Sequence, residues 1–177
     1  MSLQHLTTKA AAVRLLVCDV DGVLTDGRLY FTEDGQEFKT FNTLDGLGFK
    51  LLQQTGVKIA IITGRKSKVV SQRMTALGVE IVYQGREDKL VVLKDILEQL
   101  DLTPEQVAYL GDDLPDLPAI RHVGLGLAVA NASPMVKQYA AGVTQQNGGL
   151  GAAREVCEFI MASQGTLDAQ LAPYLCC

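Results

Sequence analysis

Short runs of apolar residues recur along the chain and alternate with segments of mixed polarity. Each run is rich in Val, Ile and Leu and ends in polar or glycine-containing sequence, which is typical of buried strands in a parallel sheet. The predicted strands are residues 12–18, 57–62, 80–83, 107–110 and 125–130. Because the runs are apolar on both faces, we expect this sheet to lie at the centre of the fold.

The segments between these runs have the spacing of helices. Within residues 87–100, leucines recur at intervals of three and four among charged residues, which predicts one apolar helix face. Gly56 and Gly78 stand where helices from about residues 45 and 66 should end. Thr103-Pro104 and Ser133-Pro134 are typical of helix starts. The alternation predicts a three-layer, Rossmann-like α/β fold with helices on both faces of a parallel sheet.

Residues 28–41 depart from this alternation. Two β-type stretches flank Glu33-Asp34-Gly35-Gln36, which predicts a small β-hairpin insertion. We find no repeat and no linker, so we expect one domain over residues 1–177, with flexible ends at 1–9 and 165–177.

Composition narrows the functional classes. The 177 residues include 16 Lys and Arg against 20 Asp and Glu, a net charge of −4 without a basic run. This balance argues against nucleic acid as a partner. No apolar stretch is long enough to span a membrane and no signal peptide is evident, so we expect a cytoplasmic protein. Cys18 and Cys157 stand alone, and the terminal pair Cys176-Cys177 matches no lipidation motif, so we predict no disulfide framework.

Polar residues follow several predicted strands, where an open parallel sheet binds ligands. Asp19 and Asp21 follow the first strand, Thr63 the second and Asp112 the fourth, while Lys89 opens a helix. Carboxylates suit a hard cation such as Mg²⁺, and Thr and Lys supply donors for phosphate oxygens. Together they suggest phosphoryl transfer. Each Asp taken alone is as readily interpreted as a helix cap or turn residue.

Four motifs in order resemble those of the haloacid dehalogenase superfamily phosphatases. They are Asp19-Val20-Asp21-Gly22-Val23-Leu24-Thr25, Ile62-Thr63-Gly64-Arg65, Lys89 and Gly111-Asp112-Asp113-Leu114-Pro115-Asp116. The resemblance implies that Asp19 attacks phosphorus to form an aspartyl-phosphate. It implies that Asp21 protonates the leaving oxygen and later activates water, and that Thr63 and Lys89 grip the phosphoryl group.

The same resemblance implies a magnesium site. Asp19, the backbone carbonyl of Asp21 and Asp112 would hold Mg²⁺, and Asp113 and Asp116 would support the metal or Lys89 from behind. Too few residues separate the motifs for a cap domain. An open site does not easily exclude water, so we expect a bulky substrate or cover from a neighbouring subunit, and hence a homo-oligomer.

A closer resemblance is to the 3-deoxy-D-manno-octulosonate 8-phosphate (KDO 8-phosphate) phosphatases of lipopolysaccharide biosynthesis. It is carried by residues 41–48, 63–67, 83–85 and 148–157. This resemblance implies hydrolysis of KDO 8-phosphate by a homotetramer whose hairpins form a central β-structure. It also implies that the C-terminal tail approaches an adjacent active site.

Further residues follow from this resemblance as candidates for the substrate pocket. Besides Asp21 and Lys89, they are Asn42, Thr43, Leu44, Asp45, Gly46, Lys50, Arg65 and Arg73. The three basic side chains would face a sugar-acid carboxylate or phosphate. For Lys50 and Arg73 a solvated helix face is an equal alternative.

Two other functions stay open at this point. The same chemistry could act on a nine-carbon, sialic-type sugar-acid phosphate, and related domains can be non-catalytic oligomerising modules. The intact set of Asp19, Asp21, Thr63, Lys89 and Asp112 argues against a non-catalytic module.

Overall fold

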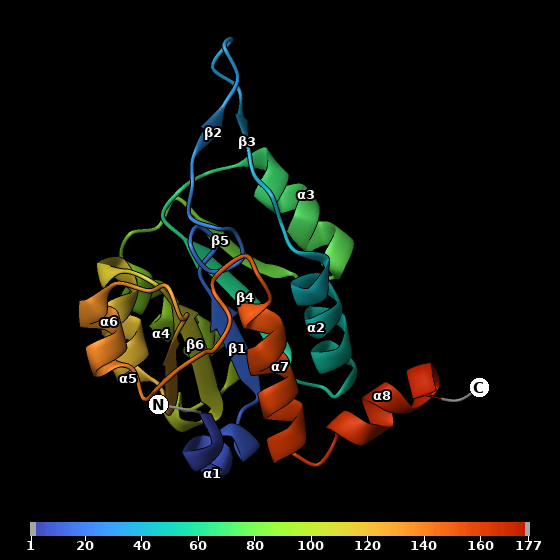
Figure 1. Cartoon of the computed structure of the whole chain (residues 1–177). Helices are drawn as coiled ribbons and strands as arrows, with labels where there is room; N and C mark the ends of the chain where they lie inside the picture. The colour runs from blue at the N-terminus through green and yellow to red at the C-terminus, as the bar shows by residue number, and fades with distance from the viewer. Residues whose placement is uncertain (1–2, 176–177) are drawn as a thin grey trace.

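The computed structural model describes residues 3–175 and is built around one six-stranded parallel sheet (Figure 1). The strand order is β5-β4-β1-β6-β7-β8. The strands are β1 Leu15–Cys18, β4 Lys58–Thr63, β5 Ile81–Gln84, β6 Val107–Gly111, β7 Leu125–Ala128 and β8 Gly142–Val143. Because β1 pairs in parallel with both β4 and β6, the carboxyl ends of these three strands meet at one edge of the sheet.

Helices cover both faces of the sheet. The longer ones are α2 Thr43–Gln54, α3 Lys68–Leu77, α4 Lys89–Leu100, α7 Ala152–Ser163 and α8 Leu167–Leu175. The shorter ones are α1 Thr7–Ala11, α5 Leu117–His122 and α6 Pro134–Tyr139, with 3₁₀ turns η1 Leu3–Leu6, η2 Pro104–Gln106 and η3 Leu114–Asp116. Helix α2 packs beside α7, and α5 packs beside α4 and α6, in two groups on opposite sides of the sheet (Figure 1).

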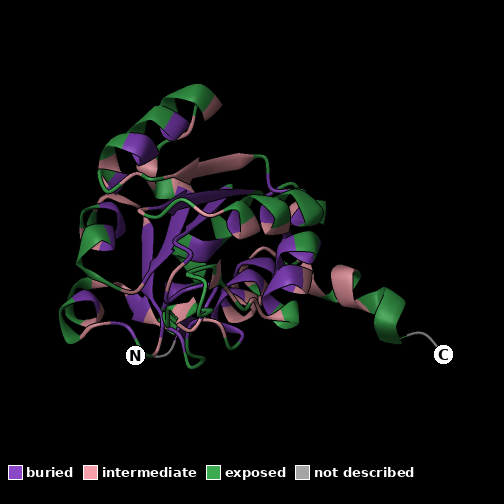
Figure 2. Ribbon diagram, turned by 90° about the horizontal axis from the view of Figure 1, so that it is seen from above, coloured by how far each residue is buried: buried purple, intermediate pink, exposed green. Residues whose placement is uncertain are grey.

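The core lies between the sheet and these helices. Strands β1, β6 and β7 are buried along their whole length, and the helices turn their exposed sides outward (Figure 2). This burial on both faces explains why the strands are continuous apolar runs. The predicted three-layer α/β fold is confirmed, and no cap domain is evident among residues 3–175.

The predicted hairpin projects from the body as a separate two-stranded antiparallel sheet (Figure 1). Its strands, β2 Tyr30–Phe31 and β3 Glu37–Phe38, have only two residues each. The rings of Tyr30 and Phe38 stack with centroids 5.2 Å apart. Phe31 is 59% exposed and Phe38 is 47% exposed, so within the monomer this hairpin has little to pack against.

Helices extend to both ends of the described chain, and the flexibility of residues 1–9 and 165–177 stays a prediction. Residues 3–11 form η1 and α1, because Leu3, Leu6 and Ala10 are apolar enough to be buried. Residues 167–175 form α8, which has no buried residue and leads away from the body (Figure 1). The sequence also missed β8, which is too short to show a period. Cys176 and Cys177 lie outside the described residues, and no helix within 3–175 is both long and apolar enough to span a membrane.

Candidate active site

Three carboxylates converge at the carboxyl edge of the sheet. Asp19 follows β1, Asp112 follows β6, and Asp116 lies in η3 directly behind Asp112. One carboxylate oxygen from each lies within 4.8 Å of the others. Asp19 is 6% exposed and Asp116 is 1% exposed, so little water screens their repulsion.

Lys89 provides positive charge to this cluster. It is the first residue of α4, and its side chain is 4% exposed. Its Nζ lies 2.9 Å from Oδ2 of Asp19 and 2.6 Å from Oδ1 of Asp116. The predicted nucleophile and the predicted phosphoryl-binding lysine are therefore in direct contact.

Asp116 is engaged by protein donors at both of its carboxylate oxygens. Lys89 and the hydroxyl of Tyr109 donate to Oδ1, the latter at 2.8 Å. The backbone N–H groups of Asp112 and Asp113 donate to Oδ2 at 3.1 and 3.3 Å. The geometry therefore suits Asp116 to a supporting part behind Asp112 and Lys89.

The cluster shifts the pKa values of its members. Burial, together with the charge of Asp116, raises the pKa of Asp19 to about 7, although Lys89 opposes the shift. Burial and the charges of Asp116 and Asp19 raise the pKa of Asp112 to about 8. Burial alone would lower the pKa of Lys89, but the neighbouring carboxylates raise it above its ordinary value. The charge of Lys89 alone therefore does not offset burial and the repulsion between the carboxylates.

These residues fit a divalent cation. Oδ1 of Asp19 is buried and has no hydrogen-bond partner among the described residues. Asp19 and Asp112 are hard oxygen donors that repel each other without a cation. The free oxygen of Asp19 and the neighbouring carboxylate of Asp112 are therefore suited to hold one.

Gly22 lets Asp112 approach the loop that follows β1. Its φ is +89°, and a Cβ at this position would lie 2.1 Å from Oδ2 of Asp112. Glycine is therefore required here both for its backbone conformation and for lack of space.

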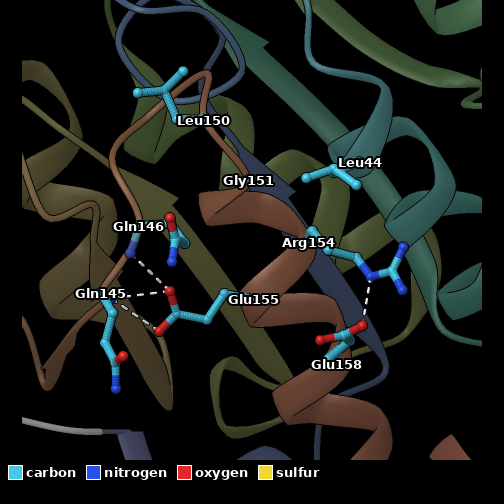
Figure 3. Close-up of a pocket in the computed structure, with 8 residues that line it drawn as sticks. All are labelled: Leu44, Gln145, Gln146, Leu150, Gly151, Arg154, Glu155 and Glu158. Carbon is cyan, nitrogen blue, oxygen red and sulfur yellow. Dashed lines mark hydrogen bonds and ion pairs between the residues drawn. The ribbon is translucent and has the colours of Figure 1, made fainter.

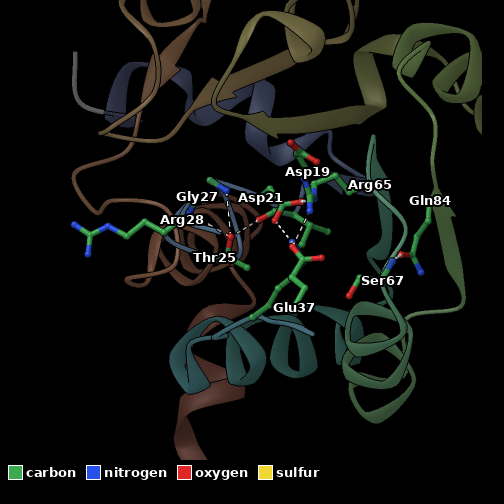
Figure 4. A network of polar contacts seen from close by, with 12 residues as sticks. Asp19, Asp21, Thr25, Gly27, Arg28, Glu37, Arg65, Ser67 and Gln84 are labelled. Carbon is green, nitrogen blue, oxygen red and sulfur yellow. Dashed lines mark hydrogen bonds and ion pairs between the residues drawn. The ribbon is translucent and has the colours of Figure 1, made fainter. Parts of the chain in front are cut away.

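Asp21 takes part in a polar network with side chains of the hairpin, close to Asp19 (Figure 4). The ammonium of Lys39 contacts the carboxylate of Asp21 and lies 3.2 Å from Oε1 of Glu37. Arg65 places Nη2 2.9 Å from the same Glu37 oxygen and Nε 4.0 Å from Asp21. The hairpin thus supplies a cation, Lys39, to the predicted acid/base group Asp21. The Lys39 side chain is only 2% exposed to solvent.

Sequence reasoning missed Lys39, Glu37 and Tyr109. Glu37 and Lys39 are two residues apart and flank the outward-facing Phe38, so strand alternation could have placed them on one face. Tyr109 lies within an apolar strand, where only its hydroxyl distinguishes it from its neighbours.

Thr63 ends β4 at the same edge of the sheet as Asp19. It is 2% exposed, and the backbone N–H of Arg86 donates to its carbonyl at 3.0 Å. The structure therefore brings the ends of β1, β4 and β6 together, as the motifs require.

The predicted substrate segment 42–46 has mixed surroundings. Asn42 caps α2, accepting from Leu44 N–H at 2.9 Å, and its Nδ2 donates to the carbonyl of Gly149 at 3.2 Å. Thr43 and Leu44 are exposed. A Cβ at the buried Gly46 would lie 2.3 Å from Nη2 of Arg73. Substrate contact from this segment stays a prediction.

Asp45 points into the protein rather than toward solvent. It is 3% exposed, and its Oδ1 accepts from the N–H of Arg154 at 2.9 Å, in the first turn of α7. Burial raises its pKa, and backbone N–H groups of α7 oppose the shift. In this conformation Asp45 ties α2 to the start of α7.

The other two basic candidates differ in their surroundings. Arg73 donates to the carbonyl of Asn42 at 3.3 Å and lies over the ring of Phe41, 6.0 Å from its centroid. Lys50 is exposed on α2. Arg73 is therefore near the predicted pocket, whereas the structure gives no contact that links Lys50 to it.

A groove of about 420 Å³ lies between α2 and the start of α7 (Figure 3). Glu155 accepts from the backbone N–H groups of Gln145 and Gln146 there, and Arg154 pairs with Glu158 at 2.6 Å. None of the clustered carboxylates lines this groove. The carboxylate cluster, rather than this groove, is therefore the candidate active site.

Comparison with known proteins agrees with this site. Residues 79–155 match the model of the haloacid dehalogenase-like hydrolases. The chain is 48% identical over 164 residues to the 3-deoxy-D-manno-octulosonate 8-phosphate phosphatase KdsC of Salmonella typhi, covering 93% of this chain and 87% of that protein. The chain belongs to the KDO 8-phosphate phosphatase family of haloacid dehalogenase-like hydrolases.

Solved structures of KDO 8-phosphate phosphatases share the fold along nearly the whole chain. That from Yersinia pestis has a TM-score of 0.91 at 47% identity, covering 92% of this chain and 88% of its own. That from Moraxella catarrhalis, in complex with magnesium ion, phosphate ion and KDO, has a TM-score of 0.95 at 40% identity, covering 97% and 99%. A family member thus holds a divalent metal and phosphate, the two ligands that the carboxylate cluster and Lys89 suit.

Proposed function

We propose that this protein is a Mg²⁺-dependent phosphatase that hydrolyses KDO 8-phosphate to KDO and phosphate in lipopolysaccharide biosynthesis. The observation that carries the proposal is the contact of Lys89 with Asp19 beside Asp112, at the meeting point of β1, β4 and β6. The match to relatives that act on this substrate supports it.

The reaction that suits these residues has two steps. The carboxylate of Asp19 attacks phosphorus, the bond to the sugar oxygen breaks, and Asp21 protonates the departing oxygen. Asp21 then takes a proton from water as that water attacks the aspartyl-phosphate, which releases phosphate and restores Asp19. Thr63 and Lys89 hold the phosphoryl oxygens in both steps.

Mg²⁺, when bound by Asp19, the carbonyl of Asp21 and Asp112, supplies positive charge against the phosphoryl group. Asp113 and Asp116 would support it from behind. Asp113 is exposed and contacts Asp116 through its backbone: its N–H donates to Oδ2 of Asp116 at 3.3 Å, and its carbonyl accepts from the N–H of Asp116 at 2.9 Å. The pairing of Asp116 with Lys89 and with the backbone of Asp112 favours this supporting part.

For the substrate, we propose that Arg65 and Arg73 face the sugar acid. Arg65 is the better supported of the two, because its side chain is partly exposed beside Asp21. We further propose a homotetramer joined through the hairpins, which the exposed Phe31 and Phe38 support. A cytoplasmic location stays a prediction from the sequence.

The test is Mg²⁺-dependent phosphate release from KDO 8-phosphate by the wild type and by Asp19→Asn. The wild type should release phosphate. Asp19→Asn should release none while keeping its fold by circular dichroism, because an amide is a poor nucleophile. Normal turnover by the folded variant would contradict the aspartyl-phosphate mechanism. No release by the wild type would contradict the proposed activity itself.

A further inference from the structure

Tyr109 is a fully buried tyrosine whose hydroxyl reaches the carboxylate cluster from within the sheet. It is 0% exposed, in the middle of β6. Its hydroxyl donates to Oδ1 of Asp116 at 2.8 Å, the oxygen that Lys89 also contacts at 2.6 Å. The residue lies outside the four motifs.

An apolar side chain would fill this place in the strand without a polar group to satisfy. A buried hydroxyl is costly unless it is hydrogen-bonded, and Asp116 is the partner that this one has. Burial and the charge of Asp116 raise the pKa of Tyr109 well above its ordinary value, so the hydroxyl keeps the proton that it donates.

This hydrogen bond helps to fix the orientation of the whole Asp116 carboxylate. Tyr109 and Lys89 hold Oδ1, and the N–H groups of Asp112 and Asp113 hold Oδ2. Because a carboxylate is planar, fixing the direction of one oxygen fixes the other. Asp116 therefore links Tyr109 to two parts of the site, namely the backbone of Asp112 and the ammonium of Lys89.

We propose that Tyr109 is a positioning residue: its hydroxyl fixes the orientation of Asp116 and, through it, the positions of Asp112 and Lys89. Its effect on turnover rests on the proposed phosphatase function. Its effect on Mg²⁺ binding does not, because binding is measured without turnover.

The experiment compares Tyr109→Phe with Tyr83→Phe. The hydroxyl of Tyr83 accepts a long hydrogen bond of 3.5 Å from Nε2 of Gln99 at an exposed position. Tyr83→Phe therefore controls for the loss of a tyrosine hydroxyl outside the carboxylate cluster. For Tyr109→Phe we expect kcat to fall about tenfold with KM for KDO 8-phosphate within about twofold, as for one lost positioning hydrogen bond. The dissociation constant of Mg²⁺, measured by calorimetry, should rise about threefold or more, because Asp116 would no longer hold Asp112 in position. Tyr83→Phe should change each quantity less than about twofold.

A second arm tests whether Tyr109 acts through Asp116. Tyr109→Phe made in an Asp116→Asn background should change the Mg²⁺ dissociation constant by less than about twofold, because the connecting carboxylate is already altered. An equal effect in both backgrounds would contradict the proposal. So would wild-type values of both kcat and Mg²⁺ affinity in Tyr109→Phe, or a change in KM alone.

A wild-type arm covers the case in which Tyr109→Phe does not fold. In protein labelled with fluorotyrosine, the Tyr109 signal should shift on addition of Mg²⁺, and Asp116→Asn should abolish the shift. A Tyr109 signal that does not shift on addition of Mg²⁺ would overturn the proposal. If the wild type releases no phosphate, the proposed function fails, whereas the calorimetric and labelling arms still decide the role of Tyr109.

Discussion

Asp19 and Asp112 face each other beside Asp116, with Lys89 as the cation in contact with Asp19. Their pKa values of about 7 and about 8 mean that the folded, metal-free protein keeps protons that the unfolded chain has released near pH 4. Between about pH 4 and about pH 8, folding of the metal-free protein is therefore accompanied by proton uptake.

The stability of the metal-free protein should fall as pH rises from about 5 to about 8. In this range the folded state binds more protons at Asp19 and Asp112 than the unfolded state does, so a rise in pH favours unfolding. We expect a loss of at least about 1 kcal/mol in the free energy of unfolding. Mg²⁺ should stabilise more at pH 8 than at pH 5.5. Urea unfolding with and without Mg²⁺ measures both, and Asp112→Asn should show less of the pH effect. A Mg²⁺ benefit that is larger at pH 5.5 would contradict this account.

Lys39 carries a second prediction at the scale of single residues. Lys39→Met removes the buried ammonium that contacts both Asp21 and Glu37 and leaves the more exposed Arg65 as their remaining cation, so we expect kcat to fall about tenfold. The exposed Lys94 of α4 provides the control Lys94→Met, which should leave kcat within about twofold. Steady-state phosphate release measures the effect, and equal activity of the two variants would show that Asp21 works without Lys39.

The sequence predicted the carboxylates and Lys89 because strand ends and motif order locate them. It did not predict Lys39, because the path of residues 32–41 decides which hairpin side chain turns toward Asp21. The place of Asp45 in the substrate pocket stays a prediction from the resemblance, and the sequence did not predict that its carboxylate accepts from the N–H of Arg154 in α7. Only the packing of α2 against α7 reveals that direction.

At the scale of elements, the loop after β1 is braced by the segment before α7. Gly149 N–H donates to the carbonyl of Val23 at 2.8 Å, and a Cβ at Gly148 would lie 1.7 Å from the carbonyl oxygen of Gly22. Sequence reasoning predicted only a tight turn at Gly148-Gly149. Its contact with a loop more than a hundred residues earlier has no signature in local sequence.

Gly22→Ala tests this close packing. The new Cβ would lie 2.1 Å from Oδ2 of Asp112, so Mg²⁺ affinity should fall at least about tenfold as that carboxylate is displaced. Gly35→Ala is the matched control, because Gly35 also has a positive φ, +79°, but nothing within 4 Å of the added Cβ. Both variants should lose about 1 kcal/mol of stability from backbone strain. Calorimetry should show weak Mg²⁺ binding in Gly22→Ala alone, and equal binding by both would contradict the account.

At the scale of the whole molecule, the hairpin and α8 lie away from a core that is otherwise well covered. Apolar side chains on a projecting hairpin are typical of an interface. The sequence predicted the hairpin from its turn, and the structure confirms it as a two-stranded antiparallel sheet. The helices near the two ends were not predicted, because the burial of Leu3 and Leu6 depends on contacts with distant residues such as Gly142.

Removing the apolar character of the hairpin should break the proposed tetramer. Phe31→Glu with Phe38→Glu places charges where the subunits would meet, so the mass by analytical ultracentrifugation should fall toward that of a monomer. Met135→Glu, at an exposed apolar position on α6, is the control and should stay assembled. An intact assembly of the double variant would contradict an interface at the hairpin. A monomeric wild type would contradict the tetramer itself.

The central claim is the identity of the substrate, and one comparison tests it most directly. Phosphate release with Mg²⁺ is measured on KDO 8-phosphate, on a nine-carbon sialic-type sugar-acid phosphate and on a hexose phosphate. We expect kcat/KM to be at least about tenfold higher for KDO 8-phosphate, as for a pocket that recognises both the carboxylate and the chain length. Equal or higher activity on the nine-carbon compound would contradict the substrate assignment, and no release from any of the three would contradict the proposed phosphatase.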